Sequence, residues 1–187
     1  MSEVKIYTRK GDDGTTGLLF GGRVAKDGLA PTAYGSVDEA QAAIGVARAE
    51  TRADPGDSPG ELGEILLGVE RDLWVLMAEM ATEPDNRHKL TAGQSLVTPE
   101  MVSALEQLID EVSGSFEPPT EFVVPGQTRT AALLDVARTV VRRAERDCVP
   151  AAQPDSQCLP YLNRLSDLLW TLARWQEGTS IATRDVH

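Results

Sequence analysis

Apolar side chains recur at helical spacing along most of the chain, beginning with two predicted helices in its first half. Ser36 and Glu39 form a capping box, which predicts that the first helix begins there and runs to about Glu50. A longer apolar stripe starts at Leu62 and predicts a second helix that ends near Thr82. Each of these helices has one apolar face to bury.

Three further helices are predicted from apolar spacing together with start and stop signals. The third has Thr98 as its N-cap and Pro99 at its first position, a place where proline is favoured. The fourth opens at a threonine, and the fifth carries a proline in its first turn. The expected ranges are 98–113, from Thr128 or Thr130 to about 146, and from Pro160 to about Trp175.

Five helices with almost no strand predict an all-α fold. The segments without helical spacing are a polar loop at 83–96, an extended stretch at 122–124 and a connector at 147–157. We therefore expect a five-helix bundle with a glycine-rich N-terminal loop. A chain of 187 residues suits a single domain, 1–187, made of an N-terminal arm at 1–32 and a helical bundle at 33–187.

The charge of the chain limits its partners. The formal net charge is -11, which disfavours binding to nucleic acid or to acidic membranes. Two segments are nevertheless basic: 5–26 carries five basic residues against two acidic ones, and 138–146 carries four against one. This layout suits capture of a compact polyanion. No apolar run could span a membrane and the first residues do not resemble an export signal, so we expect a cytoplasmic protein.

The cysteines and histidines offer no metal or redox motif. Cys148 and Cys158 lie ten positions apart, which fits neither a zinc knuckle nor a dithiol redox site. His88 and His187 are far apart in the sequence and have no neighbouring ligands. We interpret both cysteines as reduced bystanders and expect no structural transition metal.

The segment 8–17 has the composition of a phosphate-binding loop. Its glycines let the backbone approach a ligand closely, and its hydroxyls and cations suit phosphate oxygens. The spacing matches neither the P-loop nor the dinucleotide-binding pattern, so a flexible arm is an equally open interpretation.

The fourth predicted helix carries a charged face. Asp135, Arg138, Arg142 and Glu145 share it, and we expect the core stripe on the opposite face. That stripe is Leu133, Val136, Val140 and Ala144. Arginine at every basic position favours bidentate recognition of phosphate or carboxylate, although a solvated helix face also explains such charges.

Two further polar features have ordinary structural explanations. Asn163 and Asp167 lie one turn apart among leucines, where such a pair usually serves helix packing. Asp38 lies in the first turn of the first predicted helix, where an acid commonly complements the helix dipole.

Taken together, five motifs in order along the chain resemble the PduO-type ATP:cob(I)alamin adenosyltransferases. They occupy residues 7–16, 33–39, 122–126, 136–146 and 161–167. The resemblance spans nearly the whole chain, and several motifs in register are far more specific than any single one. This chain departs from the family pattern at Asp13, Gly17 and Gln127.

The resemblance implies a homotrimer of five-helix bundles with each active site between two subunits. It implies that ATP, with Mg²⁺ on the triphosphate, is bound by residues from two chains. Those from one chain are Thr8, Arg9, Lys10, Gly11, Thr16, Gly17 and Lys26, and those from the other are Arg142, Arg143, Ala144, Glu145, Arg146 and Asn163. It also implies that Asp38 pairs with Arg138 across the subunit boundary.

The resemblance further implies the reaction. Cobalt of cob(I)alamin attacks the 5′ carbon of ATP, and triphosphate leaves as one unit. Phe122 would displace the lower axial ligand of cobalt, which makes Co(II) easier to reduce. A corrinoid reductase and an adenosylcobalamin-dependent enzyme would be partners.

Two other classes of function are consistent with the same residues. One is a non-catalytic module that binds ATP or adenosylcobalamin and delivers it to another enzyme. The other is a purely structural helical bundle with no nucleotide affinity. If the arm binds ATP, we also expect it to be mobile without the nucleotide and to close over the triphosphate, because its glycines resist ordering.

Overall fold

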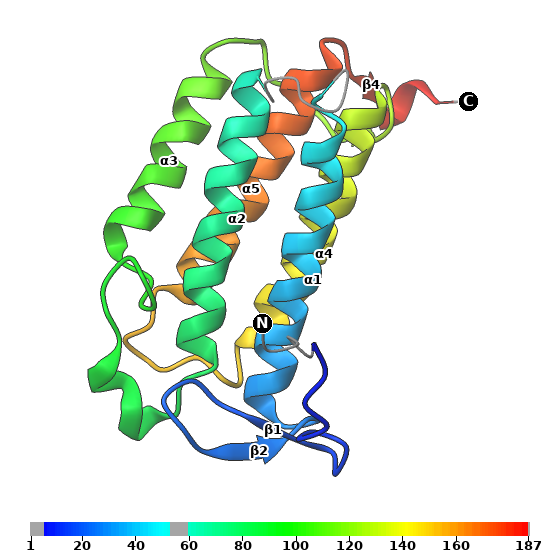
Figure 1. Ribbon diagram of the computed structural model, residues 1–187. Coiled ribbons are helices and arrows are strands. Elements are labelled where there is room, and N and C mark those ends of the chain that lie inside the picture. The colour runs from blue at the N-terminus through cyan, green and yellow to red at the C-terminus, as the bar shows by residue number, and fades with distance from the viewer. Residues whose placement is uncertain (1–5, 53–59, 187) are drawn as a thin grey trace.

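Five long helices packed side by side form the body of the computed structural model, which describes residues 6–52 and 60–186 (Figure 1). The first five residues of the predicted arm and His187 lie outside this part of the chain. The helices are α1 (Leu29–Ala49), α2 (Gly60–Met80), α3 (Pro99–Ser113), α4 (Arg129–Cys148) and α5 (Cys158–Glu177). The prediction of a mainly helical fold with five helices is confirmed for the described residues.

The helices bury their apolar faces against one another in a single core. The contacts join α1 to α2 and α4, and α5 to α3 and α4. Leu66, Leu73 and Leu169 are fully buried in this core. Burial of each such side chain contributes roughly 1.5–3 kcal/mol relative to exposure. The packed faces therefore stabilise the bundle and hold the helices in a fixed register.

Polar contacts at both ends show that α1 and α4 are antiparallel. Ser36 Oγ donates to Asp147 Oδ2 at 2.6 Å near the start of α1. At the other end, Arg129 Nε lies 3.3 Å from Glu50 Oε2. The start of α1 and the end of α4 consequently lie at the same end of the bundle (Figure 1).

The predicted start of the first helix at Ser36 is wrong. The helix begins at Leu29, with Gly28 in an extended N-cap conformation. Pro31 is accommodated because the first turn needs no N–H donor from it. Ser36 is therefore inside the helix, and its hydroxyl bonds to α4 instead of capping α1. The threonine caps of the third and fourth helices are confirmed, at Thr98 and Thr128.

The predicted core stripe of the fourth helix is partly right. Ala144 is fully buried, and Leu133 and Val140 are half-buried against the core. Val136, however, is 54% exposed. The buried face is made mainly by other residues: Ala131, Leu134, Asp135, Ala137, Val141 and Cys148. The helix has more apolar residues than one stripe needs, so spacing alone does not identify the face that meets α1 and α5.

Two small antiparallel sheets accompany the helices. The first joins β1 (Thr15–Gly17) to β2 (Arg23–Ala25), and the second joins β3 (Val123–Val124) to β4 (Ile181–Ala182). Short 3-10 helices, η1 (Pro84–Lys89) and η2 (Thr183–Asp185), complete the described elements. The glycine-rich segment thus contains a hairpin, and the extended stretch at 122–124 pairs with the C-terminal part of the chain.

None of the helices in the described residues has the length and apolar character needed to cross a membrane. Cys148 and Cys158 are both free and buried. Burial raises the pKa of the Cys148 thiol to about 12, and nearby Asp147 and Glu145 raise it further toward that value. Burial also raises the pKa of Cys158 well above its usual range. Both observations agree with the interpretation of these thiols as unreactive.

Candidate active site

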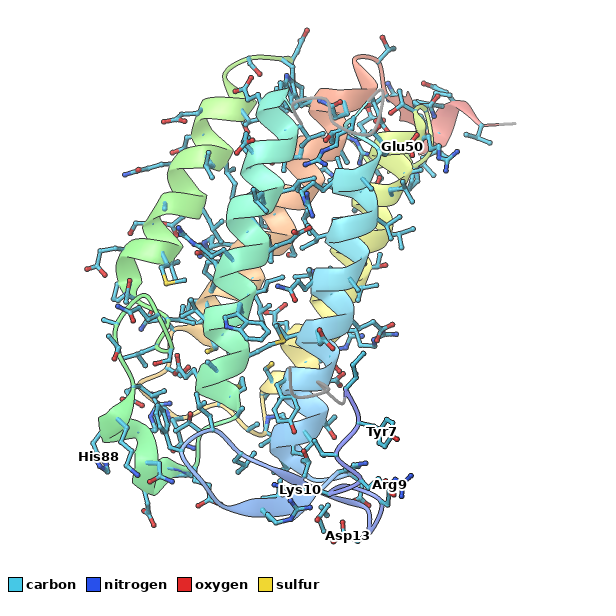
Figure 2. The ribbon with its side chains drawn as sticks, in the orientation of Figure 1. Tyr7, Arg9, Lys10, Asp13, Glu50 and His88 are labelled. Atoms are coloured by element: carbon cyan, nitrogen blue, oxygen red, sulfur yellow. The ribbon has the colours of Figure 1, made fainter. Side chains whose placement is uncertain are left out.

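The N-terminal arm forms a compact polar surface at the end of the bundle where α1 begins. Tyr7, Arg9, Lys10 and Asp13 lie together there, and Glu50 lies at the opposite end (Figure 2). The Arg9 guanidinium lies over the Tyr7 ring, 5.3 Å from its centroid. Thr8 Oγ1 accepts a hydrogen bond from Lys10 N at 3.4 Å. All these residues are exposed, so they are available to a ligand.

Internal hydrogen bonds shape the turn that follows. The Asp13 carboxylate accepts hydrogen bonds from Thr15 Oγ1 at 2.8 Å and Thr15 N at 3.0 Å. These two bonds from Thr15 hold the pKa of Asp13 below its usual range. Arg23 donates to Thr15 Oγ1 and to the Lys10 carbonyl. The turn is therefore held by its own side chains.

Gly11 and Lys26 are brought together by this arrangement. A Cβ atom at Gly11 would lie 3.1 Å from Lys26 Nζ, so glycine allows the lysine side chain to lie against the backbone. Lys26 N also donates to the Gly14 carbonyl at 2.9 Å. Thr16 and Gly17 occupy β1 of the same hairpin. The structure thus places the seven predicted arm residues in one continuous segment of surface.

The hairpin is attached to the end of α2 through contacts that sequence reasoning missed. Leu19 N donates to the Ala81 carbonyl at 2.9 Å. Gly22 has a φ of +91°, and a Cβ atom there would lie 2.5 Å from Glu83 Oε1. The Gly21-Gly22 pair was a sequence signal for a tight turn at this place.

A second group of predicted residues lies where α4 meets α5. Asn163 Nδ2 of α5 donates to Glu145 Oε1 of α4 at 3.2 Å, and Arg164 Nη1 donates to Asn163 Oδ1 at 2.6 Å. Arg142 lies one turn before Glu145 on the same side of α4 and is exposed. Arg146 Nη1 folds back onto the Arg142 carbonyl at 2.8 Å.

The other two predicted residues of this segment face elsewhere. Arg143 forms an ion pair with Glu39 of α1. Ala144 is fully buried in the core. Arg142 and Arg143 therefore lie on different sides of α4: Arg143 faces α1, and Arg142 shares the side of Glu145, which contacts α5.

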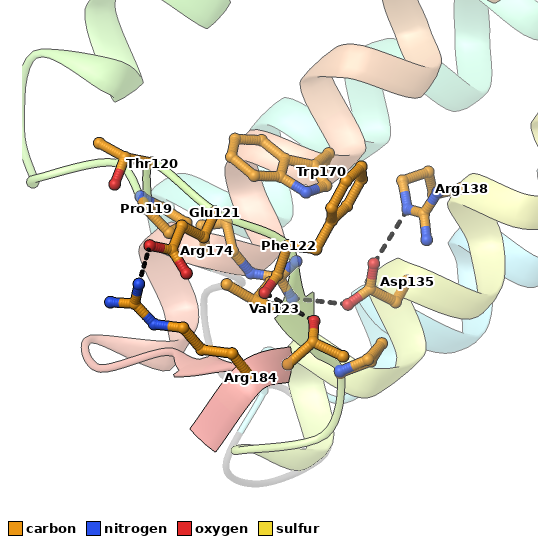
Figure 3. A pocket seen from close by; sticks show the side chains of 12 residues that line it. Pro119, Thr120, Glu121, Phe122, Val123, Asp135, Arg138, Trp170, Arg174 and Arg184 are labelled. Carbon is orange, nitrogen blue, oxygen red and sulfur yellow. Dashed lines mark hydrogen bonds and ion pairs between the residues drawn. The ribbon is translucent and has the colours of Figure 1, made fainter. Parts of the chain in front are cut away.

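Phe122 stands in the largest described pocket, which has a volume of about 810 Å³ (Figure 3). Its walls are the loop from Pro119 to Pro125, Asp135 and Arg138 of α4, Trp170 and Arg174 of α5, and the C-terminal Thr183 and Arg184. Phe122 is 90% exposed, so its ring is not part of the hydrophobic core. An exposed phenylalanine in a cavity this large is suited to contact with an apolar ligand surface.

A buried charge network forms the floor of this pocket. Arg174 Nη2 donates to Asp135 Oδ2 at 2.6 Å, and both Arg174 Nε and Nη2 donate to Glu177 at 2.8 Å. Asp135 also accepts from Arg138 Nε at 2.9 Å. The Arg174 guanidinium lies 5.7 Å from the centroid of the Trp170 ring. Sequence reasoning missed Arg174, whose only signal was a cation beside an apolar helix face.

Asp38 and Arg138 are not paired within one chain. Asp38 lies on the exposed side of α1, about midway along the helix and not in its first turn as predicted, because α1 begins at Leu29. Arg138 lies about midway along α4 and bonds to Asp135. Similarly, no hydrogen bond or ion pair joins the arm to Arg142, Glu145 or Asn163 in the residues that the structure describes. Within a single chain the two groups of predicted ATP-binding residues are therefore not bonded to each other, although the start of α1 and the end of α4 lie at the same end of the bundle.

No cluster of three or more histidine, cysteine or carboxylate side chains that could hold a metal ion occurs in the described part of the chain. The cations of the arm and the arginines of α4 instead suit a ligand that carries its own negative charge.

Comparison with known proteins identifies the family. The family model described as cobalamin adenosyltransferase matches residues 6–176. A corrinoid adenosyltransferase of Citrobacter freundii is 40% identical over 94% of this chain and 96% of its own length. One of Bacillus subtilis is 38% identical over 91% of this chain and 86% of its own.

Solved structures agree with these relatives. A variant PduO-type ATP:corrinoid adenosyltransferase from Lactobacillus reuteri, complexed with cobalamin and ATP, superposes with a TM-score of 0.84 at 27% identity over 97% of both chains. A second variant of that enzyme, complexed with ATP, gives a TM-score of 0.80 over 96% of this chain and 100% of its own. The chain therefore belongs to the cobalamin adenosyltransferase family, whose members are ATP-dependent enzymes that adenosylate a corrinoid.

Proposed function

We propose that this enzyme transfers the 5′-deoxyadenosyl group of ATP to cob(I)alamin and releases triphosphate. The observation that carries the proposal is the exposed Phe122 in a pocket with Arg138, one helical turn from the exposed Arg142. One turn corresponds to a rise of about 5.4 Å, so a corrinoid at Phe122 and a phosphate at Arg142 would be neighbours.

ATP is held by two surfaces in this proposal. The arm contributes Thr8, Arg9, Lys10, Gly11, Thr16, Gly17 and Lys26, and α4 with α5 contributes Arg142, Glu145, Arg146 and Asn163. Ala144 is buried and Arg143 pairs with Glu39 of α1, so neither is included. The exposed cations and hydroxyls of the two surfaces match the phosphate oxygens, and Mg²⁺ is bound mainly by those oxygens. The family match supports this assignment because it covers all of these residues.

The reaction needs no proton transfer from the protein. The cobalt electron pair forms the bond to the 5′ carbon, and the carbon–oxygen bond to triphosphate breaks with its electrons on the leaving oxygen. Negative charge grows on that oxygen in the transition state, so a fixed guanidinium such as that of Arg142 stabilises the transition state more than bound ATP. The protein then catalyses the reaction by positioning the two reactants and by placing positive charge at the leaving oxygen.

Phe122 acts on the corrinoid rather than on ATP. Its exposed ring can lie against the lower face of the corrin and exclude the lower axial ligand, which leaves a four-coordinate cobalt that accepts an electron more readily. An apolar ring suits this role because it blocks the position without offering a ligand atom. Asp135 and Arg138 line the same pocket and are bonded to each other.

The active site is completed by a second chain in a homotrimer. In the described residues no hydrogen bond or ion pair joins the arm to Arg142, Glu145 or Asn163 of the same chain, which is consistent with this arrangement. Val46 of α1 and Val136 of α4 are 55% and 54% exposed, respectively, on helices that pack together. Exposed apolar residues on neighbouring helices fit a subunit contact. Asp38 of one subunit would meet Arg138 of the next across this contact.

We expect the enzyme to act in the cytoplasm, with a corrinoid reductase as supplier of electrons and an adenosylcobalamin-dependent enzyme as acceptor of the product. The two free, buried cysteines are consistent with a reducing compartment.

The reaction is tested by mixing the purified protein anaerobically with chemically reduced cob(I)alamin and MgATP. The proposal predicts one adenosylcobalamin and one triphosphate per turnover. The Phe122→Ala variant should bind ATP normally but lose transfer when the reaction starts from cob(II)alamin and a reductant. ATP binding without any transfer by the unmodified protein would instead indicate a non-catalytic carrier.

A further inference from the structure

The segment that follows α5 is attached to β3 and to Phe122, the residue directly before that strand. Residues 181–185 form β4 and η2, and β4 pairs with β3 so that Val123 faces Ala182 and Val124 faces Ile181. The family model ends at residue 176, so this C-terminal segment lies beyond the matched region.

Thr183 binds the backbone of Phe122 directly. The Phe122 carbonyl oxygen accepts two hydrogen bonds from Thr183, one from its N at 2.8 Å and one from its Oγ1 at 2.7 Å. Two donors on one carbonyl fix its direction. Because Phe122 directly precedes β3, these bonds and the β3–β4 pairing together hold its backbone and so limit the directions in which its side chain can point.

The residue before Phe122 is held by the same segment. Arg184 Nη1 lies 2.7 Å from Glu121 Oε1, and this ion pair lies at the mouth of the pocket (Figure 3). Glu121, Phe122 and Val123 are thus each tied to a residue of the C-terminal segment.

Phe122 needs such support because its ring obtains none from the core. The ring is 90% exposed, whereas Val123 and Val124 beside it are half-buried. A loop that presents an apolar side chain to solvent is free to rotate that side chain inward unless its backbone is held. In the described structure the hydrogen bonds of Thr183 are the contacts that hold it.

We propose that Thr183 is a positioning residue for Phe122 and that the segment Ile181–Arg184 holds the phenylalanine ring against the corrinoid. This inference rests on the proposed function, because it takes Phe122 to act on the corrinoid. None of the proposed ATP-binding residues belongs to this segment, so we expect its effect to fall on the cobalt and not on nucleotide binding.

The test compares variants of Thr183 with a matched control in the same segment. Thr183→Val keeps the branched shape and removes the hydroxyl, Thr183→Ser restores a hydroxyl, and Thr183→Pro also removes the N–H donor. Thr179→Val is the control, because Thr179 is exposed and precedes β4. The readouts are the fraction of four-coordinate Co(II) in the presence of MgATP, the transfer rate and the affinity for ATP.

We expect Thr183→Val to lower the four-coordinate fraction and the transfer rate roughly fivefold, the factor that corresponds to one lost hydrogen bond. Thr183→Pro should lower both further, while Thr183→Ser and Thr179→Val should match the unmodified enzyme. Affinity for ATP should stay the same in all four. Circular dichroism checks that each variant is folded. If Thr183→Pro does not fold, the comparison of Thr183→Val with the unmodified enzyme still tests the proposal.

Phe122→Ala, measured in parallel, separates two kinds of failure. If Phe122→Ala abolishes the four-coordinate signal but Thr183→Val leaves it unchanged, the positioning role of Thr183 is wrong and the role of Phe122 stands. If Phe122→Ala itself leaves the signal unchanged, the proposed action of Phe122 is wrong and the positioning role is lost with it.

Discussion

At the scale of single residues, Asp135 links the charges of the Phe122 pocket. Its two carboxylate oxygens accept from different arginines: Oδ1 from Arg138 and Oδ2 from the buried Arg174. Arg138 uses Nε for this bond, and in the described residues no contact occupies its terminal nitrogens. Those nitrogens remain available for an anion or for Asp38 of another subunit. Asp135 thus orients the Arg138 side chain while leaving both terminal guanidinium nitrogens of Arg138 free to bind another group.

Asp135→Asn should destabilise the enzyme because it removes the charge that two arginines share. Disruption of a buried ion pair typically lowers the free energy of unfolding by about 3–5 kcal/mol. Arg174 still pairs with Glu177 in this variant, so we expect a loss at the lower end of that range. Urea unfolding measures the loss. Asp110→Asn on the exposed side of α3 is the control and should change stability by less than about 0.5 kcal/mol. Equal stability of the two variants would contradict the role of Asp135.

Arg142→Ala should slow transfer strongly while leaving the fold intact. Its guanidinium is exposed beside the Glu145–Asn163 contact, so little stability depends on it. Loss of a group that stabilises the leaving oxygen typically lowers kcat about 10²- to 10³-fold. Steady-state kinetics with cob(I)alamin check this, with Arg71→Ala on the exposed side of α2 as control. A kcat that hardly changes would show that Arg142 does not contact the triphosphate.

At the scale of elements, spacing and caps predicted which segments are helical. Thr98 and Thr128 act as caps because each is followed by donors with no other partner. The start of α1 was missed because Ser36 satisfies the capping pattern while its hydroxyl bonds to Asp147, 111 residues away. A local pattern cannot reveal a partner so distant in sequence.

Local sequence patterns were equally limited in predicting the residues of the candidate active site. The charged face of α4 was predicted correctly, since Asp135 contacts Arg138 and Glu145 contacts Asn163. The core stripe was only partly right: Val136 is exposed, whereas Asp135 is buried beside Arg174, a partner 39 residues away. The pairing of β3 with β4 also depends on packing that no periodicity encodes.

The hairpin of the arm should depend on glycine at position 22. In Gly22→Ala the Glu83 carboxylate must move, and a positive φ remains strained for alanine at a cost of about 1 kcal/mol. We expect calorimetry to show weaker ATP binding. Gly68→Ala is the control: it adds a methyl group to an open position in α2 and should stabilise the helix by about 0.5–1 kcal/mol. Unchanged ATP affinity in Gly22→Ala would contradict a role for the hairpin.

At the scale of the whole molecule, the tight packing around the two cysteines should protect them. Burial raises the pKa of Cys148 to about 12, so almost no thiolate is present at pH 8. A thiol reagent should therefore label neither cysteine in the native enzyme and both after denaturation. Rapid labelling of the folded protein would show that this end of the bundle opens readily.

The proposed trimer places Val46 and Val136 at a subunit contact. Val46→Glu should weaken the assembly because it places a charge in an apolar interface. Sedimentation should then give a smaller mass than that of the unmodified enzyme, and transfer should fall in parallel. Ala104→Glu on the exposed side of α3 is the control and should remain trimeric. A Val46→Glu protein that keeps the mass of three chains would place the contact elsewhere.

The central claim is that the arm of one chain and the α4–α5 surface of another form each active site. It is tested most directly by the transfer rate of mixed trimers made from two inactive variants, Lys26→Ala and Arg142→Ala. In a random mixture about a quarter of the sites between chains carry two intact halves, so about a quarter of the activity should return. Mixed trimers that form but stay inactive would show that both halves come from the same chain.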